Sequence, residues 1–274
     1  MKLKENLEQI LCPICKSSKN KIELNNGQFQ YLKCMNCNLI YRKNYFSRQE
    51  KEELYVNAKD FEGYLKNIDK FISPFNRILN LITKFKNKGK LLDIGCNLGL
   101  FLSLANKRGF ETYGVELSKA AVIYARKQFK LNVLNKTLKE AKFKDKYFDI
   151  VVINHVIEHV EDPISEILEI RRILKDDGIL ILGTPNYNSI FSKILRERWP
   201  SIQPKYHLFL FSPQTINLLF KRTGFKLVYL STENREFNTK NILIKSAYNF
   251  MSEIISKLGY GEAMLITASK SDIL

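Results

Sequence analysis

Four cysteines near the start of the chain have a spacing that suits a metal ion. Cys12 and Cys15 form one C-x-x-C pair, Cys34 and Cys37 form a second, and eighteen residues separate the pairs. Two residues between cysteines allow one tight turn to present both thiolates to a single ion, and two such turns complete a tetrahedral shell. The spacing therefore predicts a structural zinc site, because four thiolates leave no position open for substrate.

The three histidines of the chain also lie where they could do chemistry. His155 and His159 flank Glu158 directly after a long apolar run, and His207 lies in an aromatic-rich stretch further on. Histidine titrates near neutral pH and is a common metal ligand, so one or more of them could serve as a base or hold a metal. A structural role, in which Glu158 and His159 cap a helix and His207 supports a loop, stays open as the alternative.

A glycine-containing loop between these two regions has the form of a cofactor-binding turn. It follows the apolar run 91–94, and residues 100–108 after it have helical spacing. Glycine lets the backbone turn at positive φ, and the first turn of a helix presents free N–H groups to an anionic ligand. Glu116 ends the next apolar run, where a carboxylate can accept hydrogen bonds from both ribose hydroxyls of a nucleotide. The loop residues are Gly95, Cys96, Asn97 and Gly99.

The elements that must position these side chains alternate between strand and helix. Short apolar runs are separated by stretches with helical spacing, a pattern typical of a parallel, doubly wound α/β sheet. The pattern predicts strands at 91–94, 112–115, 131–134, 148–153, 178–182, 226–230 and 263–268. It predicts helices at 100–108, 120–129, 163–174 and 242–257, the last inserted between the sixth and seventh strands.

A smaller set of strands is predicted around the cysteines. Residues 21–24 and 28–32 alternate like strands on either side of the hairpin turn 25–27, and residues 39–41 suit a third strand. With the cysteines, these strands predict a zinc ribbon over residues 1–44, which is too small to fold without its metal.

The rest of the chain divides into two further parts. Residues 45–89 are expected to form a helical connector, with an apolar stripe that is interrupted near Pro74 and packs against the following domain. Residues 90–274 form the α/β domain.

The charge of the chain is strongly basic but does not by itself indicate a partner. There are 44 Lys and Arg residues against 28 Asp and Glu, a net charge of +16, and 45% hydrophobic residues exclude wholesale disorder. Lysines outnumber arginines three to one, whereas arginine is the residue preferred for planar phosphate recognition. The first residues lack a signal-peptide core, and no apolar window reaches the ~20 residues of a membrane span, so a cytoplasmic location is expected.

The motifs together resemble those of class I S-adenosylmethionine-dependent methyltransferases. The resemblance covers the first loop, the ribose-binding strand end, and the fourth and fifth strands, from about residue 91 to residue 225. It implies a Rossmann-like seven-stranded sheet of order 3-2-1-4-5-7-6 that binds S-adenosylmethionine. The matching segments are DIGCNLG (93–99), GVELS (114–118), FDIVVINHVIEHV (148–160) and RILKDDGILILGTPN (172–186).

The resemblance also implies roles for individual residues. Asp93 would steady the loop, Glu116 would hold the ribose, and Leu117 would lie against the adenine. Asn154, Gly95, Cys96, Asn97 and Gly99 would surround the methionine part of the cofactor, and Thr137 and Leu138 would border the adenine edge. Members of the family usually have glycine at the position of Asn97. Asparagine tolerates positive φ best among the other residues, so the loop is expected to keep its shape.

Three functions are compatible with these features. The first is methylation of a hydroxyl on a small molecule, such as a sugar, a quinone-like compound or a glycan precursor. The second is methylation of RNA, which the basic charge favours, and the third is a noncatalytic module that binds a cofactor or a partner. His155, Glu158, His159 and His207 are the catalytic candidates. Ubiquinone-pathway and small-RNA O-methyltransferases have similar Glu and His clusters that hold a divalent metal, although the former have Glu where His155 stands, and such a second metal is a further hypothesis.

Overall fold

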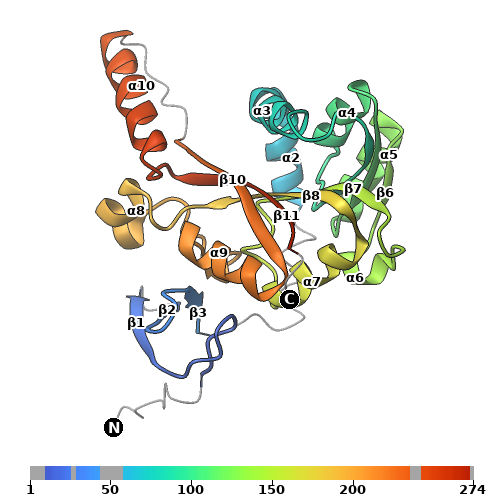
Figure 1. Ribbon diagram of the computed structural model, residues 1–274. Helices are drawn as coiled ribbons and strands as arrows, with labels where there is room; N and C mark the ends of the chain where they lie inside the picture. The colour runs from blue at the N-terminus through green and yellow to red at the C-terminus, as the bar shows by residue number, and fades with distance from the viewer. Residues whose placement is uncertain (1–9, 26–28, 44–57, 235–241, 272–274) are drawn as a thin grey trace.

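A computed structural model describes residues 10–25, 29–43, 58–234 and 242–271, and its centre is a seven-stranded sheet (Figure 1). From one edge to the other the strands are β6 (Asn132–Leu134), β5 (Phe110–Val115), β4 (Gly89–Ile94), β7 (Phe148–Asn154), β8 (Leu174–Pro185), β11 (Ala263–Lys270) and β10 (Phe225–Glu233). The first five run parallel, whereas β11 is antiparallel to both of its neighbours. This order confirms the predicted methyltransferase sheet.

Helices cover both faces of the sheet because alternate residues of the parallel strands point in opposite directions. Leu91, Ile150 and Val152 pack in one core with α3 (Ile72–Ile82), α4 (Leu100–Lys107) and α5 (Lys119–Phe129). Leu92 and Val151, their neighbours along the chain, pack in another core. The helices of that second face are α6 (Leu138–Ala141), α7 (Pro163–Ile173) and α9 (Pro213–Arg222).

The connector folds as short helices above the first face. α2 (Ala58–Lys66) is followed by the 3-10 turn η2 (Ile68–Phe71) and then by α3. The predicted interruption therefore lies just before Pro74, which occupies the first turn of α3, where its missing N–H has no helical partner to lose. The expected boundary between residues 44 and 45 lies outside the described residues, as does the centre of the hairpin turn at 26–28.

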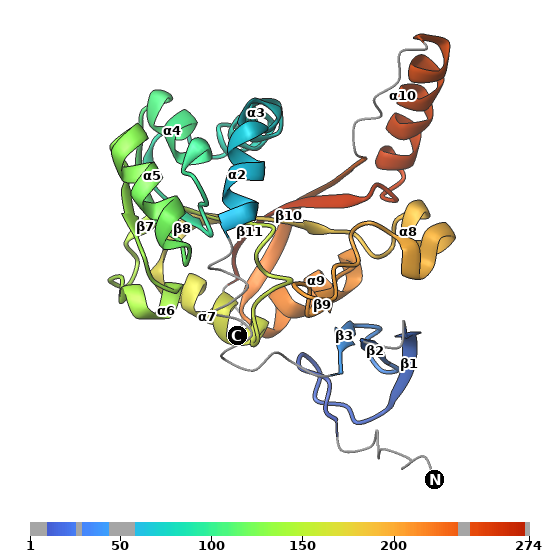
Figure 2. The ribbon, with the colours of Figure 1, turned by 180° about the vertical axis from the view of Figure 1, so that it is seen from behind.

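The cysteine-bearing strands form a second sheet that reaches into the main domain. β1 (Asn20–Asn25), β2 (Gln30–Cys34) and β3 (Ile40–Arg42) pair antiparallel in that order, close to the predicted ranges. β3 also pairs with β9 (Phe209–Leu210), a strand of two residues from the segment between β8 and α9 (Figure 2). Sequence patterns did not predict β9, and it joins the ribbon to the domain that carries the histidines.

The remaining helices lie towards one end of the sheet. α8 (Ile190–Leu195) and the 3-10 turn η3 (Arg196–Arg198) follow β8, and α10 (Ile242–Lys257) projects from the body before β11, as predicted for the inserted helix (Figure 1). Within the described residues, no helix is long and apolar enough to cross a membrane.

Candidate active site and metal centre

A cavity of about 670 Å³ opens at the carboxyl ends of the parallel strands. Its floor includes the loop after β4, its far side is formed by the ends of β10 and β11, and α3 lies over it. Asn154 at the end of β7 and His155 just after it, together with His159 and His207, line the side towards the second helical layer. Open parallel sheets bind ligands at this edge, so the cavity is the candidate active site.

The loop after β4 has the backbone that its glycines predict. Gly95 has φ 73°, Asn97 has φ 47° and Gly99 has φ 79°, so all three are left-handed. Asn97 therefore takes the conformation expected of a glycine at its position. The amides of Gly95 and Cys96 both donate to the Val115 carbonyl, at 2.8 and 3.2 Å, which ties the loop to the end of β5.

Glu116 braces this loop from the neighbouring strand. One carboxylate oxygen accepts a hydrogen bond from the Asn97 amide at 2.9 Å, and the other accepts from the Ser118 amide at 2.8 Å. The carboxylate thus lies beside the loop at the end of β5, the position from which a ribose would be held.

Two titratable side chains beneath the loop are buried. Burial, with a smaller contribution from the charge of Glu116, raises the pKa of Asp93 well above its usual value. Burial also raises the pKa of the Cys96 thiol well above its usual range, so Cys96 is not a thiolate nucleophile. A Cβ on Gly114 would come within 2.7 Å of the Cys96 sulfur, so the absence of a side chain at 114 makes room for Cys96.

Glu158 is the buried centre of the histidine side of the cavity. Its side chain is 1% exposed, and its two oxygens contact His155 Nδ1 at 3.3 Å and the Thr184 hydroxyl at 3.1 Å. Burial alone would raise the pKa of Glu158, but the hydrogen bond from His155 and the charges of the surrounding histidines lower it to about 2. Glu158 is therefore ionised at neutral pH despite its burial.

His159 and His207 each have one ring nitrogen held by the backbone. His159 Nδ1 lies 2.9 Å from the Tyr206 carbonyl, which only accepts, so this nitrogen carries the proton and Nε2 has a free lone pair. His207 bonds the Ser201 backbone, and its Nδ1 is buried without a hydrogen-bond partner in the described structure. Burial lowers the pKa of His207 to about 4, so its ring is neutral at pH 7.

Glu158, His159 and His207 together fit a divalent metal. One ligand atom from each residue lies within 4.8 Å of the other two, and the two imidazole rings are 4.8 Å apart in an edge-to-face arrangement. A carboxylate with two imidazoles, each fixed through its second nitrogen, is a donor set typical of metal sites. The unpartnered Nδ1 of His207 is the atom that such an ion would satisfy.

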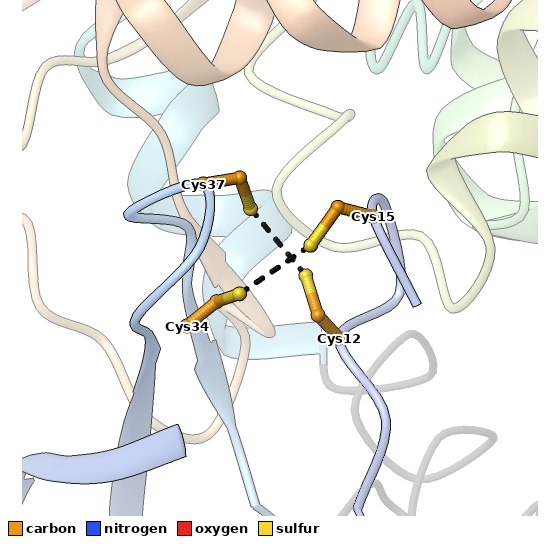
Figure 3. A group of neighbouring side chains, drawn as sticks. All are labelled: Cys12, Cys15, Cys34 and Cys37. Carbon is orange, nitrogen blue, oxygen red and sulfur yellow. Dashed lines mark hydrogen bonds between the residues drawn. The ribbon is translucent and has the colours of Figure 1, made fainter. Parts of the chain in front are cut away.

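The four cysteines of the ribbon also converge (Figure 3). The sulfurs of Cys12 and Cys37 are 3.6 Å apart and those of Cys15 and Cys34 are 3.4 Å apart, with all four within 4.8 Å of one another. A tetrahedral Zn²⁺ with Zn–S bonds of about 2.3 Å needs sulfurs about 3.8 Å apart. The cluster is therefore consistent with a zinc-binding module.

Comparison with known proteins identifies the chain. A family model described as a methyltransferase domain matches residues 64–230. The chain belongs to the S-adenosylmethionine-dependent methyltransferases.

Similar sequences include a ubiquinone biosynthesis O-methyltransferase from Rickettsia typhi. It is 36% identical over 121 residues, which cover 40% of this chain and 49% of that protein. An uncharacterized protein from Methanocaldococcus jannaschii is 26% identical over 220 residues, covering 78% of this chain and 98% of the relative. The methyltransferase thus spans about half the length of the ubiquinone enzyme it matches.

Solved structures share the fold. A methyltransferase from Archaeoglobus fulgidus has a TM-score of 0.57 and 25% identity, covering 76% of this chain and 99% of that one. A Burkholderia thailandensis 1,6-didemethyltoxoflavin N1-methyltransferase, solved with S-adenosylhomocysteine, has a TM-score of 0.54 and 13% identity. It covers 92% of this methyltransferase and all of that chain.

The structure brings most of the predicted site residues of the methyltransferase to one cavity. Those that line it are Asp93, Gly95, Cys96, Asn97, Asn154, His155, His159 and His207. Glu116 and Glu158 lie behind this lining and contact it through Asn97 and His155. Gly99 starts α4, Leu117 is exposed, Thr137 caps α6 and Leu138 is buried in the core. The predicted contacts of all these residues with the cofactor stay predictions.

Sequence patterns missed part of the cavity wall. Tyr64, Phe71 and Phe75 of the connector line the cavity, and the rings of Tyr64 and Phe71 stack at 4.2 Å. Arg77 of α3 also lines it and pairs with Glu233 at the end of β10, at 3.2 Å. The apolar stripe of the connector was expected only to pack in the core. The large share of aromatic rings in that stripe is the signal that could have indicated a ligand-facing role.

The left-handed loop gives a first prediction. Replacing Asn97 by Ala should destabilise the protein by roughly 1 kcal/mol and weaken S-adenosylmethionine binding several-fold, because alanine resists φ near 47°. Asn97→Gly should retain both properties. Calorimetric titration and urea denaturation measure the two effects. Equal behaviour of both variants would contradict the assignment of strain to this position.

Proposed function

We propose that this methyltransferase transfers a methyl group to a hydroxyl of a small, ring-bearing molecule. The observation that carries the proposal is the buried, ionised Glu158 with His155, His159 and His207 around it, facing the cofactor loop across one cavity. Methylation of a hydroxyl needs a base or a cation to activate the oxygen, and this cluster can supply both.

The cofactor side of the cavity fits S-adenosylmethionine. The left-handed loop, the start of α4 and the Glu116 carboxylate suit its polar ends. When bound, S-adenosylmethionine supplies an electrophilic methyl group on a sulfonium sulfur. The protein has to hold this methyl group in line with the attacking oxygen and to exclude water.

His155 is placed to act as the base. It lines the cavity, its side chain is 54% exposed, and its Nδ1 contacts the Glu158 carboxylate. A carboxylate that accepts the Nδ1 proton leaves Nε2 free to take the proton of an acceptor hydroxyl, and it stabilises the imidazolium that forms. His155 has φ 55°, a left-handed backbone conformation that is uncommon for residues other than glycine.

The neighbouring group of Glu158, His159 and His207 would hold a divalent cation. A cation there would supply Lewis-acid activation of the acceptor oxygen. The protein's contribution is the orientation of the ligands, through the Tyr206 carbonyl on His159 and the Ser201 backbone on His207.

The walls of the cavity favour a small ring-bearing acceptor over RNA. Tyr64, Phe71 and Phe75 offer flat apolar faces, whereas Arg77 is the single Lys or Arg among the described lining residues and is already paired with Glu233. Among the described residues, this lining therefore offers no unpaired Lys or Arg to the phosphates of an RNA chain. The Rickettsia typhi relative is a ubiquinone biosynthesis O-methyltransferase, which supports a hydroxyl oxygen as the acceptor.

The acceptor class can be tested with labelled cofactor. Cell extract is divided into RNA, protein and small-metabolite fractions, and each is incubated with the enzyme and S-adenosyl[methyl-³H]methionine. Label is expected in the metabolite fraction, in a methyl group bonded to an ether oxygen. Label confined to RNA would overturn the proposal, and failure to bind S-adenosylmethionine at all would favour a noncatalytic module.

Glu158→Gln tests the acidic centre. Glutamine keeps the shape but removes the charge, so methyl transfer should fall at least about 100-fold and Mn²⁺ binding should be lost. The affinity for S-adenosylmethionine should stay within twofold. Glu166→Gln, at a partly buried glutamate of α7 that does not line the cavity, is the matched control. Full activity in Glu158→Gln would rule out this role.

We also propose that the cysteine cluster binds zinc as a structural ion. Elemental analysis should find one zinc per chain from this site, and Cys34→Ser should lose it and unfold at lower temperature. Cys96→Ser, which changes the one other cysteine, should keep the zinc. Zinc retained by Cys34→Ser at wild-type stability would contradict the assignment.

A further inference from the structure

The segment 203–209 lies between the ribbon and the catalytic side chains. Its amides at Leu208 and Phe209 donate to the backbone carbonyl of Glu158, at 2.7 and 3.2 Å. The Tyr206 carbonyl, in the same segment, is the partner of His159 Nδ1. This short stretch, whose strand β9 is two residues long, therefore positions both Glu158 and His159 and carries His207 itself.

The ribbon holds the same segment from the opposite side. The Tyr31 hydroxyl, on β2, donates to the His207 carbonyl at 2.7 Å in a fully buried position. The Arg42 guanidinium donates to the Pro204 carbonyl at 2.7 Å, and the Arg42 amide donates to the Leu208 carbonyl at 2.8 Å. Three carbonyls of the segment thus accept hydrogen bonds from the ribbon, whereas the Tyr206 carbonyl faces His159 in the candidate active site.

Apolar packing joins the same two parts. Leu24, Tyr31 and Ile40 of the ribbon form one buried cluster with Leu210 of β9. Strand pairing adds Ile40 opposite Leu210 and Tyr41 opposite Phe209. The hydrogen bond of Tyr31 is therefore buried beside this packed interface and that of the Arg42 guanidinium is partly buried, and a bond to the backbone away from water is stronger than an exposed one.

We propose that the cysteine ribbon is a structural part of the active site, in which Tyr31 and Arg42 are positioning residues that fix His207 and His159. This inference rests on the proposed function in one respect, because it takes these histidines to serve methyl transfer. It adds a function for the ribbon, which in this arrangement holds the segment that carries His207 on the acceptor side of the cavity.

Tyr31→Phe tests the proposal, with Tyr41→Phe as the matched control. Both tyrosines are buried in adjacent ribbon strands, but the Tyr41 hydroxyl donates to Asn20 within the ribbon, at 2.8 Å. Three properties are measured in the full-length protein: amide hydrogen exchange, Mn²⁺ affinity by electron paramagnetic resonance, and S-adenosylmethionine affinity by calorimetry. Zinc content and the urea midpoint show whether each variant is folded.

Tyr31→Phe should raise the rate of amide exchange at Leu208 and Phe209. It should also weaken Mn²⁺ binding roughly tenfold, the effect expected when a hydrogen bond that orients metal ligands is lost. Zinc content and S-adenosylmethionine affinity should stay at wild-type levels. Tyr41→Phe should change neither exchange at these amides nor Mn²⁺ binding. Arg42→Lys, which keeps the charge but loses the planar fork, should reproduce the Tyr31→Phe pattern even if Tyr31→Phe itself folds poorly.

Indistinguishable results for Tyr31→Phe and Tyr41→Phe would overturn the inference. If the wild-type protein binds no Mn²⁺ and methylates no small molecule, the proposed function fails instead. Exchange at Leu208 and Phe209 then still decides whether the ribbon fixes the segment, because that measurement requires neither metal nor substrate.

Discussion

The parallel pairing of β4, β5, β7 and β8 is the constraint on which the site depends. Because these strands run in one direction, the residues that follow them meet at one edge of the sheet, although they are far apart in the sequence. The register places Ile94 beside both Val115 and Ile153, so the loop at Gly95 lies between Glu116 and Asn154. The loop proposed to bind the cofactor, the carboxylate of Glu116 and the chain that leads to His155 therefore meet because of one hydrogen-bonded ladder.

The close approach of residues at this edge of the sheet also requires glycine at particular positions. Asn154 pairs with Gly183 on β8, and a Cβ at 183 would come within 1.9 Å of the Asn154 amide oxygen. A Cβ on Gly95 would come within 2.5 Å of the Val156 side chain. These glycines allow close packing against neighbouring side chains, and Gly95 in addition has the positive φ of the loop.

Local patterns predicted the strands and the site loops because their signals lie within short stretches of sequence, whereas the order of the strands followed from the resemblance of the motifs to a known family. Apolar runs, the C-x-x-C pairs and the glycines around Asn97 each identify an element without knowledge of its neighbours. Contacts between distant segments left no such signal. The wall formed by Tyr64 and Phe75, and the pairing of β9 with β3, arise only when the connector and the ribbon fold back on the sheet. The short helices α6 and α8 were missed because few residues carry their periodicity.

Burial of an ionised carboxylate explains why the ribbon and the methyltransferase domain share a sheet. A charge as buried as Glu158 is costly unless its surroundings are fixed, and the segment that carries His207 is too irregular to fix itself. The outer edge of β3 has backbone N–H and C=O groups that β1 and β2 do not pair, and β9 forms hydrogen bonds with them. This pairing shortens the exposed strand edge, which could otherwise pair with another chain and lead to aggregation. A ribbon of this size has little core of its own. Free energy released when thiolates bind a metal would therefore stabilise not only the ribbon but also the strand edge that holds the acceptor side of the site in place.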